Sequence, residues 1–198
     1  MSEYVYWCYI LSLCFDYTLQ FLASACLLYN KKLLSQASAA PAGWLWGIVG
    51  MILFYPYVIK YHLDIMKTYN SAFIIIQAYG YILTWEIAKH WNKILTKGLK
   101  IIFILFAFIV CCYIYSKKGT WNFGTLQFLQ AITGLFASLF LTFDSPRLRM
   151  IGWYCMAASN IFCLSHVIGN NGWIIAFFQA WSIKYARTGI LKERELKT

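Results

Sequence analysis

The sequence predicts an all-α membrane protein, in which seven transmembrane helices form two parallel three-helix bundles joined by a linker helix. The first observation behind this prediction is composition. Of the 198 residues, 61% are hydrophobic and 12% are charged, against about 25% charged residues in soluble proteins. The second observation is an internal repeat, and the third is the distribution of the basic residues between apolar runs.

The two halves of the chain repeat one another in short motifs that keep the same order. Residues 18–22 recur letter for letter as residues 125–129, and a Gly-Trp pair and a Gln-Ala-aromatic triplet follow each copy. The pairs are Gly43-Trp44 and Gly152-Trp153, and the triplets are Gln77-Ala78-Tyr79 and Gln179-Ala180-Trp181. The offset between the copies drifts from 107 to 109 and then to 102, which connecting loops of unequal length would produce. We therefore predict two copies of one unit.

Seven apolar runs are long enough to be read as membrane-spanning helices, since a span needs about 20 residues. The first run is long enough to tilt or to begin in the interface, and the last is short, so its basic side chains would reach back to the lipid headgroups. The runs extend from Tyr4 to Tyr29, Gly43 to Ile59, Ser71 to Ala88, Leu99 to Tyr115, Phe123 to Phe143, Met150 to Gly169 and Trp173 to Tyr185.

The fourth run separates the two repeats. An odd number of spans between corresponding helices gives both repeats the same orientation in the membrane, which is the parallel arrangement. We therefore predict a first three-helix repeat over 1–95, a linker helix over 96–118, and a second three-helix repeat with a short basic tail over 119–198. The linker carries no polar residue between Ile101 and Cys112, which indicates a helix that faces lipid.

The net charge of +10 is explained by topology. With seven spans, thirteen of the seventeen Lys and Arg residues, beginning with Lys31 and Lys32, fall on one side of the membrane and four on the other. The positive-inside rule then places the N-terminus outside and the C-terminus in the cytoplasm. We assign the basic residues to topology and to anionic lipids, and we expect no nucleic-acid partner.

Catalytic and metal-binding motifs are missing from the sequence. The seven cysteines all lie within apolar runs, and no CxxC pair has a His at zinc-ligand spacing. No paired carboxylates, nucleophile triad, glycine-rich phosphate loop or HExxH motif is present. We predict neither an enzyme nor a metal or cofactor site.

Polar residues inside the apolar runs mark the candidate binding site, because they are costly in lipid unless they face the bundle interior. Gln77 and Gln179 stand at matching places in the third and seventh runs, each followed two positions on by an aromatic residue, Tyr79 or Trp181. An amide and an aromatic ring can together bind a flat polar solute. The alternative is that each glutamine only hydrogen-bonds a neighbouring helix, and the sequence leaves both open.

Three further residues are candidates. Asn160 follows Trp153 by seven residues, which places both on one face of a helix; the corresponding position after Trp44 is Met51. Asp16 is an acid within the first run, where it could couple transport to a cation or contact a cationic solute. Asn70 is read instead as a residue at the start of the third helix.

The predicted architecture resembles the SWEET sugar transporters and the PnuC-type nicotinamide riboside transporters. The closer resemblance is to the PnuC type and is carried by Trp153 and Asn160, which look like the W-x6-N pattern of that family's sixth helix, and by Gln77 and Trp181. The chain departs from the family at Met51, where many members carry an asparagine. The resemblance implies facilitated diffusion of a small vitamin-like solute, such as nicotinamide riboside or a related nucleoside, by alternating access in a bacterial inner (plasma) membrane.

Other functions stay open at this point. A sugar or other metabolite is the second transport hypothesis, and a non-transporting membrane scaffold is the hypothesis of a different class. The expected partners are a small-molecule substrate and the lipid bilayer, and self-association into a homo-oligomer is left open.

Overall fold

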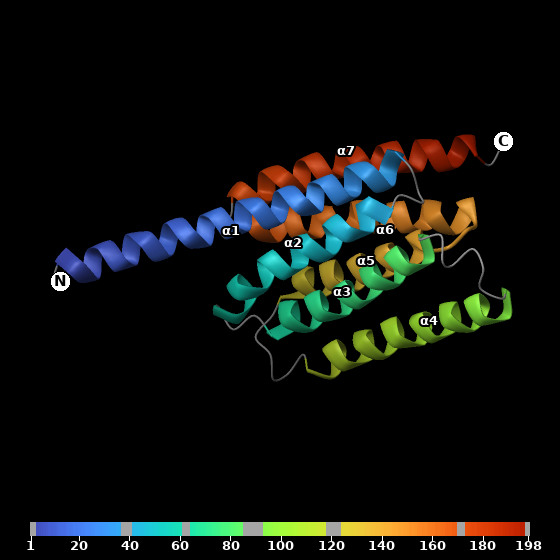
Figure 1. Cartoon of the computed structure of the whole chain (residues 1–198), viewed down its shortest axis with the longest axis horizontal. Helices are drawn as coiled ribbons and strands as arrows, with labels where there is room; N and C mark the ends of the chain where they lie inside the picture. Colours follow the sequence, from blue (N-terminus) through green and yellow to red (C-terminus); the bar gives the residue numbers. More distant parts are fainter. Residues whose placement is uncertain are drawn as a thin grey trace.

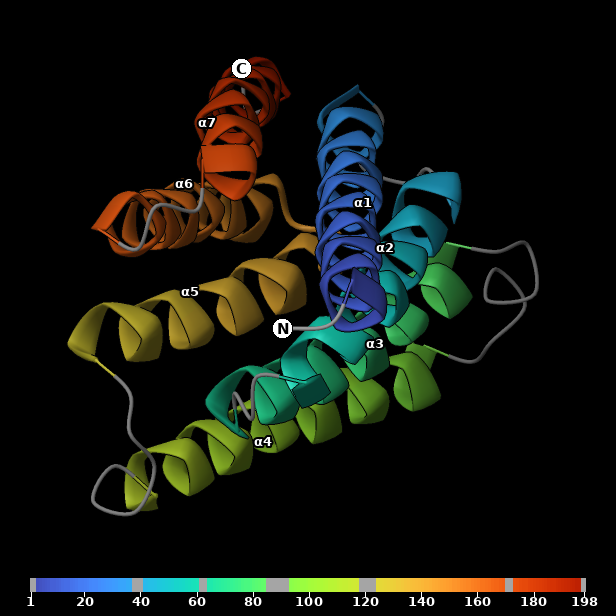
Figure 2. The same ribbon diagram turned by 90° about the vertical axis from the view of Figure 1, so that its left-hand side faces the viewer.

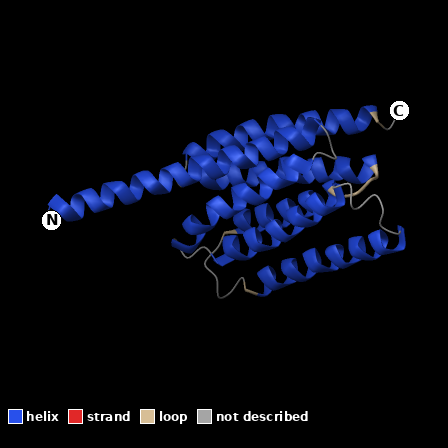
Figure 3. Cartoon of the chain, viewed as in Figure 1, coloured by secondary structure: helices blue, strands red, loops and turns tan. Residues whose placement is uncertain are grey.

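The computed structural model describes residues 3–36, 41–60, 64–84, 93–117, 124–169 and 173–196, and within these ranges all regular structure is helical (Figure 3). Proline is the first residue of two helices, where its missing N–H costs no hydrogen bond. The helices are α1 (Glu3–Gln36), α2 (Pro41–Lys60), α3 (Asp64–Thr84), α4 (Lys93–Ser116), α5 (Thr125–Leu141), α6 (Pro146–Gly169) and α7 (Trp173–Glu195).

Four of the described helices contain a segment long and apolar enough to cross a membrane. These segments are Tyr6–Gln36, Pro41–Lys60, Lys97–Ser116 and Pro146–Gly169, in α1, α2, α4 and α6. The helix α5 is also apolar but has only 17 residues. The structure is therefore that of an all-α protein with membrane-spanning character, and the count of seven spans stays a prediction.

The helix boundaries differ from the predicted ones mainly at polar ends. The helix α1 continues to Gln36, α3 begins already at Asp64, and α7 continues to Glu195. Hydropathy ends a predicted span at the first charged residues, but a helix continues into them because they are good helix formers. The predicted ends at Ala88 and Phe123 lie outside the described residues, as do the basic residues Lys89, Lys118 and Lys197.

Six of the helices form a closed ring. The helices in contact are α1 with α2, α2 with α3, α3 with α5, α5 with α6, α6 with α7, and α7 with α1. Figure 2 shows this order when the molecule is viewed from the N-terminal end of α1. In Figure 1, α1, α3, α5 and α7 run in one direction and α2, α4 and α6 run in the other. The helices α5 to α7 thus have the same directions as α1 to α3.

The three helices of each triplet follow one another along the ring. In each triplet the middle helix, α2 or α6, packs along both of its neighbours, whereas among the described residues the backbone of α1 does not run beside that of α3, nor that of α5 beside that of α7. Each triplet is therefore an arc, and the two arcs meet at α3 with α5 and at α7 with α1.

The helix α4 lies outside the ring. It contacts only α3 and α5 among the described helices, and it lies along the lower edge of the molecule in Figure 1. It begins at Lys93, three residues before the predicted start of the linker. Side chains such as Ile102, Phe108 and Ile109 are more than half exposed, and Ala107 and Ile114 are the residues that it buries. Its position suits the linker role that the sequence predicts.

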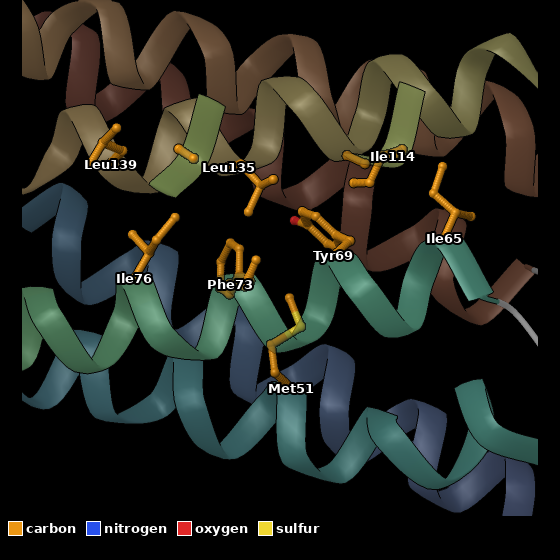
Figure 4. Packing of buried hydrophobic residues seen from close by; sticks show 11 residues of the cluster. Met51, Ile65, Tyr69, Phe73, Ile76, Ile114, Leu135 and Leu139 are labelled. Carbon is orange, nitrogen blue, oxygen red and sulfur yellow. The ribbon is translucent and has the colours of Figure 1, made fainter. Parts of the chain in front are cut away.

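An apolar core joins α3 to α4 and α5. Figure 4 shows Tyr69, Phe73 and Ile76 of α3 on the side that faces Leu135 and Leu139 of α5. All of these side chains are at most 7% exposed. A fully buried large apolar side chain stabilises by about 1.5 to 3 kcal/mol, so this cluster is a main support of one of the two junctions between the arcs.

A buried ion pair ties the first turn of α6 to the end of α7. The guanidinium of Arg149 donates two parallel hydrogen bonds to the carboxylate of Glu193, both 2.9 Å long. It also donates to the carbonyl oxygens of Phe143 and Asp144 in the α5–α6 connection. Because the Glu193 side chain is only 2% exposed, the pair is a fixed part of the packing at this end of the ring.

Candidate functional site

A cavity of about 460 Å³ lies at the centre of the ring. All six ring helices contribute residues to its wall, and α4 contributes none of the described ones. Sites for small molecules are commonly about 300 to 1,000 Å³. The cavity is therefore large enough for a solute of nucleoside or vitamin size.

Many of the lining residues form pairs at a constant spacing in the two halves of the chain. The spacing is 107 residues between α1 and α5, and 109 residues both between α2 and α6 and between α3 and α7. The pairs are Gln20 with Gln127, Met51 with Asn160, Phe54 with Cys163, Tyr57 with His166, Met66 with Ile175, and Asn70 with Gln179. Corresponding positions of the two repeats thus face the same cavity.

The spacing of 109 is also that of a packing contact. Trp44 of α2 lies on Gly80 of α3, and Trp153 of α6 lies on Gly189 of α7. A Cβ atom on Gly80 would be 2.6 Å from the Trp44 ring, and one on Gly189 would be closer still to the Trp153 ring. Each indole therefore needs a glycine on the next helix, and the contact sets the register of the two helices.

The pairs α1–α2 and α5–α6 repeat two further contacts. Gly43 packs on Leu34, and Gly152 packs on its counterpart Leu141. Gly50 lies against the carbonyl oxygen of Ala23, and at the corresponding place the Ser159 hydroxyl donates a 3.0 Å hydrogen bond to the carbonyl oxygen of Gln130. The interhelical contacts of one arc are therefore rebuilt in the other.

Several buried polar atoms of the cavity wall have no partner. The atoms Asn70 Nδ2, Gln130 Oε1, Asn160 Nδ2 and Gln179 Oε1 are buried without a hydrogen bond in the described structure, and all four residues line the cavity. A buried polar group without a partner costs about 1 to 3 kcal/mol. Four such groups around one cavity indicate a place built to hold a polar solute or water.

A lysine is part of the same wall. The Lys31 ammonium, on α1, donates a 2.7 Å hydrogen bond to Asn160 Oδ1 on α6. Lys31 is 8% exposed and Asn160 is 2% exposed. This bond crosses the cavity region from the first arc to the second.

The wall near the N-terminal end of α5 carries a second polar pair. Gln127 Nε2 and His166 Nε2 are 2.9 Å apart and hydrogen-bonded, and Gln20 and Tyr57 stand at the corresponding positions of the first half. Polar groups thus line the cavity at both ends of its length.

An apolar cluster closes the ring at the end where α1 and α5 terminate and α2 and α6 begin. Trp44 and Trp153 are 0% and 1% exposed. They pack with Leu34, Leu141 and Met156, and Met156 also lines the cavity. We call these five residues the closing cluster.

Two of the six predicted site residues line the cavity. Asn160 and Gln179 do so, and Trp153 lies one turn before Met156 in the closing cluster. The predicted wall of Trp153 and Asn160 is thus one helix face that passes from the closing cluster into the cavity.

Gln77 is not part of the cavity wall. Its Oε1 atom accepts a 3.3 Å hydrogen bond from Asn30 Nδ2, and its Nε2 atom donates a 3.4 Å bond to Ser138 Oγ. Asn30 Nδ2 also donates to the Gly43 carbonyl oxygen at 2.6 Å. These bonds join α1, α2, α3 and α5. Gln77 thus hydrogen-bonds neighbouring helices, which was the alternative interpretation of the two glutamines.

The two aromatic candidates lie away from the cavity. The Tyr79 ring stacks on Phe103 of α4 with centroids 3.8 Å apart. Trp181 is 44% exposed and donates a 3.4 Å hydrogen bond from Nε1 to the Tyr185 hydroxyl. Neither of these two rings is positioned to stack on a solute in the cavity.

Asp16 pairs with a basic residue of the chain. Its carboxylate forms an ion pair with Lys60 at the end of α2, and Lys60 also donates a 2.9 Å hydrogen bond to Ser12 Oγ. Asp16 does not line the cavity. The cationic group that contacts Asp16 in the structure is therefore the ammonium of Lys60.

The sequence interpretation missed Asn70 and Lys31. Asn70 was assigned to the helix start, but it is 1% exposed and lies in the second turn of α3. Lys31 was counted only as a topology signal. The spacing from tryptophan to glycine, which is 36 residues for both Trp44 to Gly80 and Trp153 to Gly189, is the signal that would have aligned Asn70 with Gln179.

No family model, curated protein or solved structure matches the chain. Within the described residues, no three His, Cys, Asp or Glu side chains gather where a metal ion could be held.

Proposed function

We propose that the protein is a membrane transporter for a small polar solute, which binds in the central cavity. The observation that carries the proposal is the set of four unpartnered buried polar atoms on residues lining one cavity of about 460 Å³. A purely structural bundle gains nothing from such atoms, since each of them lowers stability. A solute that completes their hydrogen bonds would recover that cost on binding.

The proposed architecture is a pair of parallel repeats joined by α4. The constant spacings of 107 and 109 residues support it, since they relate both the cavity wall and the interhelical contacts. In transporters built from parallel repeats the solute site lies between the repeats. Residues of both arcs line the cavity. The cavity therefore lies between the proposed repeats, where such transporters bind their solute.

Alternating access would then consist of opening the closing cluster and narrowing the opposite end. In the positive-inside orientation, Trp44 and Trp153 would lie at the cytoplasmic end of the ring, and the closing cluster would separate the cavity from the cytoplasm in this conformation. The two Trp–Gly contacts are rigid units within their arcs, so rocking of one arc against the other would separate the two indoles. The proposal involves facilitated diffusion and no catalytic step.

Vitamin-like solutes are the first class to test. The protein would be reconstituted into liposomes, and the uptake of radiolabelled nucleosides, including nicotinamide riboside, and of vitamins and sugars would be compared with that of protein-free liposomes. We expect saturable uptake of at least one member of the panel. Equal uptake with and without inserted protein, across the whole panel, would reject transport of these classes and favour a scaffold.

Two glutamine variants form a matched test of the site. Gln179→Leu changes a cavity residue, and Gln77→Leu changes a residue of the same type outside the cavity. We expect Gln179→Leu to fold and lose solute flux, and Gln77→Leu to lower the melting temperature while keeping flux in the fraction that is folded. The reverse pattern would place the solute at Gln77 and contradict the assignment of the cavity.

A further inference from the structure

Among the described residues, Lys31 is a positive charge in the cavity wall that has no carboxylate as a partner. No Asp or Glu lines the cavity, and no described carboxylate lies within ion-pair distance of Lys31. The carboxylates of Asp16, Asp64, Asp144 and Glu193 pair with other basic residues. A buried charge with no compensating charge is unfavourable, so an anion placed beside Lys31 would be held strongly.

The contact with Asn160 fixes a second donor next to the ammonium. A lysine ammonium only donates hydrogen bonds, so the Asn160 atom at 2.7 Å from it must be the amide oxygen. The amide nitrogen is then the atom that remains, and it is buried without a partner. Lys31 and Asn160 together therefore offer N–H donors and a positive charge, while the acceptor of the pair is already used.

Of the two adjacent lysines, Lys31 lines the cavity and Lys32 does not. Lys32 is only partly buried, and its ammonium lies 5.7 Å from the ring centroid of Tyr29 on the same helix. Adjacent residues of a helix point in directions about 100° apart, which follows from 3.6 residues per turn. Lys31 is thus the one of the two that faces the ring interior.

The chemistry of the wall selects a singly charged anion. Lys31 and His166 are the only basic residues among the described lining residues, and no arginine is among them. A phosphate monoester carries nearly two negative charges at neutral pH, whereas a carboxylate carries one, which a single ammonium compensates. The free amide atoms of Asn70, Gln130 and Gln179 are available for the neutral polar part of the solute.

We infer that the cavity binds a solute with one carboxylate group, held by Lys31 Nζ and Asn160 Nδ2. The inference rests on the proposed function only for the use of the cavity as the solute site, and it does not need transport. It also separates candidate solutes, because the pyridinium charge of nicotinamide riboside would be repelled by Lys31. Vitamins and metabolites with one carboxylate are the better match.

The test compares acids with neutral analogues of the same shape. The purified full-length protein in detergent would be heated with nicotinate or nicotinamide, and with pantothenate or pantothenol. We expect at least one acid to raise the melting temperature more than its neutral analogue, because a ligand that binds only the folded state stabilises it. Protection of the Cys163 thiol, which lines the cavity, from a small thiol reagent by the same acid would locate the binding. Stabilisation by the neutral analogues alone, or by no member of the panel, would overturn the inference.

Two methionine variants are the matched controls. Lys31→Met keeps the length of the side chain and removes the charge, so we expect the acid-induced shift to disappear and the melting temperature without ligand to rise. Lys32→Met should leave the acid-induced shift unchanged. An undiminished shift in Lys31→Met, or a lower melting temperature without ligand in that variant, would overturn the assigned role of Lys31.

Transport assays separate this inference from the proposed function. If an acid binds through Lys31 but does not cross liposome membranes that contain the protein, the carboxylate site stands and the transporter proposal fails. If a neutral or cationic solute is transported and no acid binds, the transporter proposal stands and the carboxylate site fails.

Discussion

The first arc, α1 to α3, and the second arc, α5 to α7, share their packing but differ in their polar residues. Asn30 and Gln77 hydrogen-bond each other in the first arc, and the corresponding positions of the second arc hold Ala137 and Ala186. In the cavity wall, Met51 of the first arc corresponds to Asn160 of the second. Corresponding packing positions of the two arcs hold residues that make the same interhelical contacts. These polar side chains, in contrast, occur in one arc and are replaced by apolar ones at the corresponding positions of the other.

This difference makes the two halves of the cavity wall chemically unequal. A cavity with two identical halves would offer the same groups twice. Here Lys31 comes from the first arc, and its counterpart in the second arc is Ser138, which accepts a hydrogen bond from Gln77. A solute with one charged end and one neutral end can therefore bind in a single orientation.

The largest effect is expected from the ion pair that only the second arc contains. Glu193→Ala leaves the Arg149 guanidinium, whose side chain is 12% exposed, without its charge partner, and we expect the free energy of unfolding to fall by about 3 kcal/mol, the lower end of the range for buried pairs. The position corresponding to Glu193 in the first arc is Thr84, whose side chain carries no charge. Chemical unfolding in detergent would measure the loss.

Asp144→Ala is the control for that experiment. The Asp144 carboxylate pairs with Lys100 but its side chain is 93% exposed, and exposed pairs contribute at most about 1 kcal/mol. Equal losses in the two variants would mean that burial does not determine the strength of the Arg149–Glu193 pair.

The two Trp–Gly contacts should be equally sensitive to an added methyl group in the two arcs. Gly80→Ala and Gly189→Ala each place a methyl group against an indole, and overpacking of this kind costs about 1 to 3 kcal/mol. We expect both variants to lower the melting temperature by similar amounts. Gly98→Ala in α4 is the control, because a Cβ atom there meets nothing within 4 Å, and it should stabilise the helix by about 0.5 to 1 kcal/mol. A loss in one arc only would contradict their equivalence.

A smaller effect is expected from the amide pair that only the first arc contains. Asn30→Ala, Gln77→Ala and the double variant form a thermodynamic cycle, and we expect a coupling free energy of about 0.6 to 2 kcal/mol between the two amides. The helices should still pack, since alanine occupies both corresponding positions in the second arc. Strictly additive losses would show that the Asn30–Gln77 hydrogen bond contributes no stability.

The smallest effect is expected at Trp181. Trp181→Leu changes an outward-facing side chain, and a surface substitution usually alters stability by no more than about 0.5 kcal/mol. Solute binding should remain as in the unchanged protein, in contrast to Gln179→Leu two residues earlier. A loss of binding in Trp181→Leu, measured by thermal stabilisation, would return that residue to the site.

The predictable part of the fold was the part that hydrophobicity determines. Apolar runs correctly placed the seven helices of the described residues, and the repeated motifs predicted two halves. The grouping into two parallel three-helix bundles stays a prediction, because the sequence of a helix shows which residues are apolar but not which neighbour covers them. Ring closure depends on contacts such as α1 with α7 that no local pattern contains.

The site was predicted only where a residue could be assigned to a helix face by local spacing. Asn160 was identified because it follows Trp153 by two turns. Gln77 was paired with Gln179 through matching letters at a spacing of 102, whereas the Trp–Gly contacts give a spacing of 109 and pair Asn70 with Gln179. The two spacings differ by seven residues, which is two helical turns. Gln77 therefore lies on the same face of α3 as Asn70, but two turns further along the helix. Lys31 and Lys32 are equivalent in sequence, and only helix rotation distinguishes them.

The length of α1 has a consequence for how the protein sits in a bilayer. Its 34 residues span about 51 Å at 1.5 Å per residue, whereas the hydrocarbon layer is about 30 Å thick. The N-terminal end of α1 projects past the other helices of the ring, as Figure 1 shows. That stretch carries exposed aromatic side chains, among them Trp7 and Tyr9, which favour the headgroup region. We expect this stretch to lie in the headgroup region and to set how deeply the ring is immersed in the bilayer.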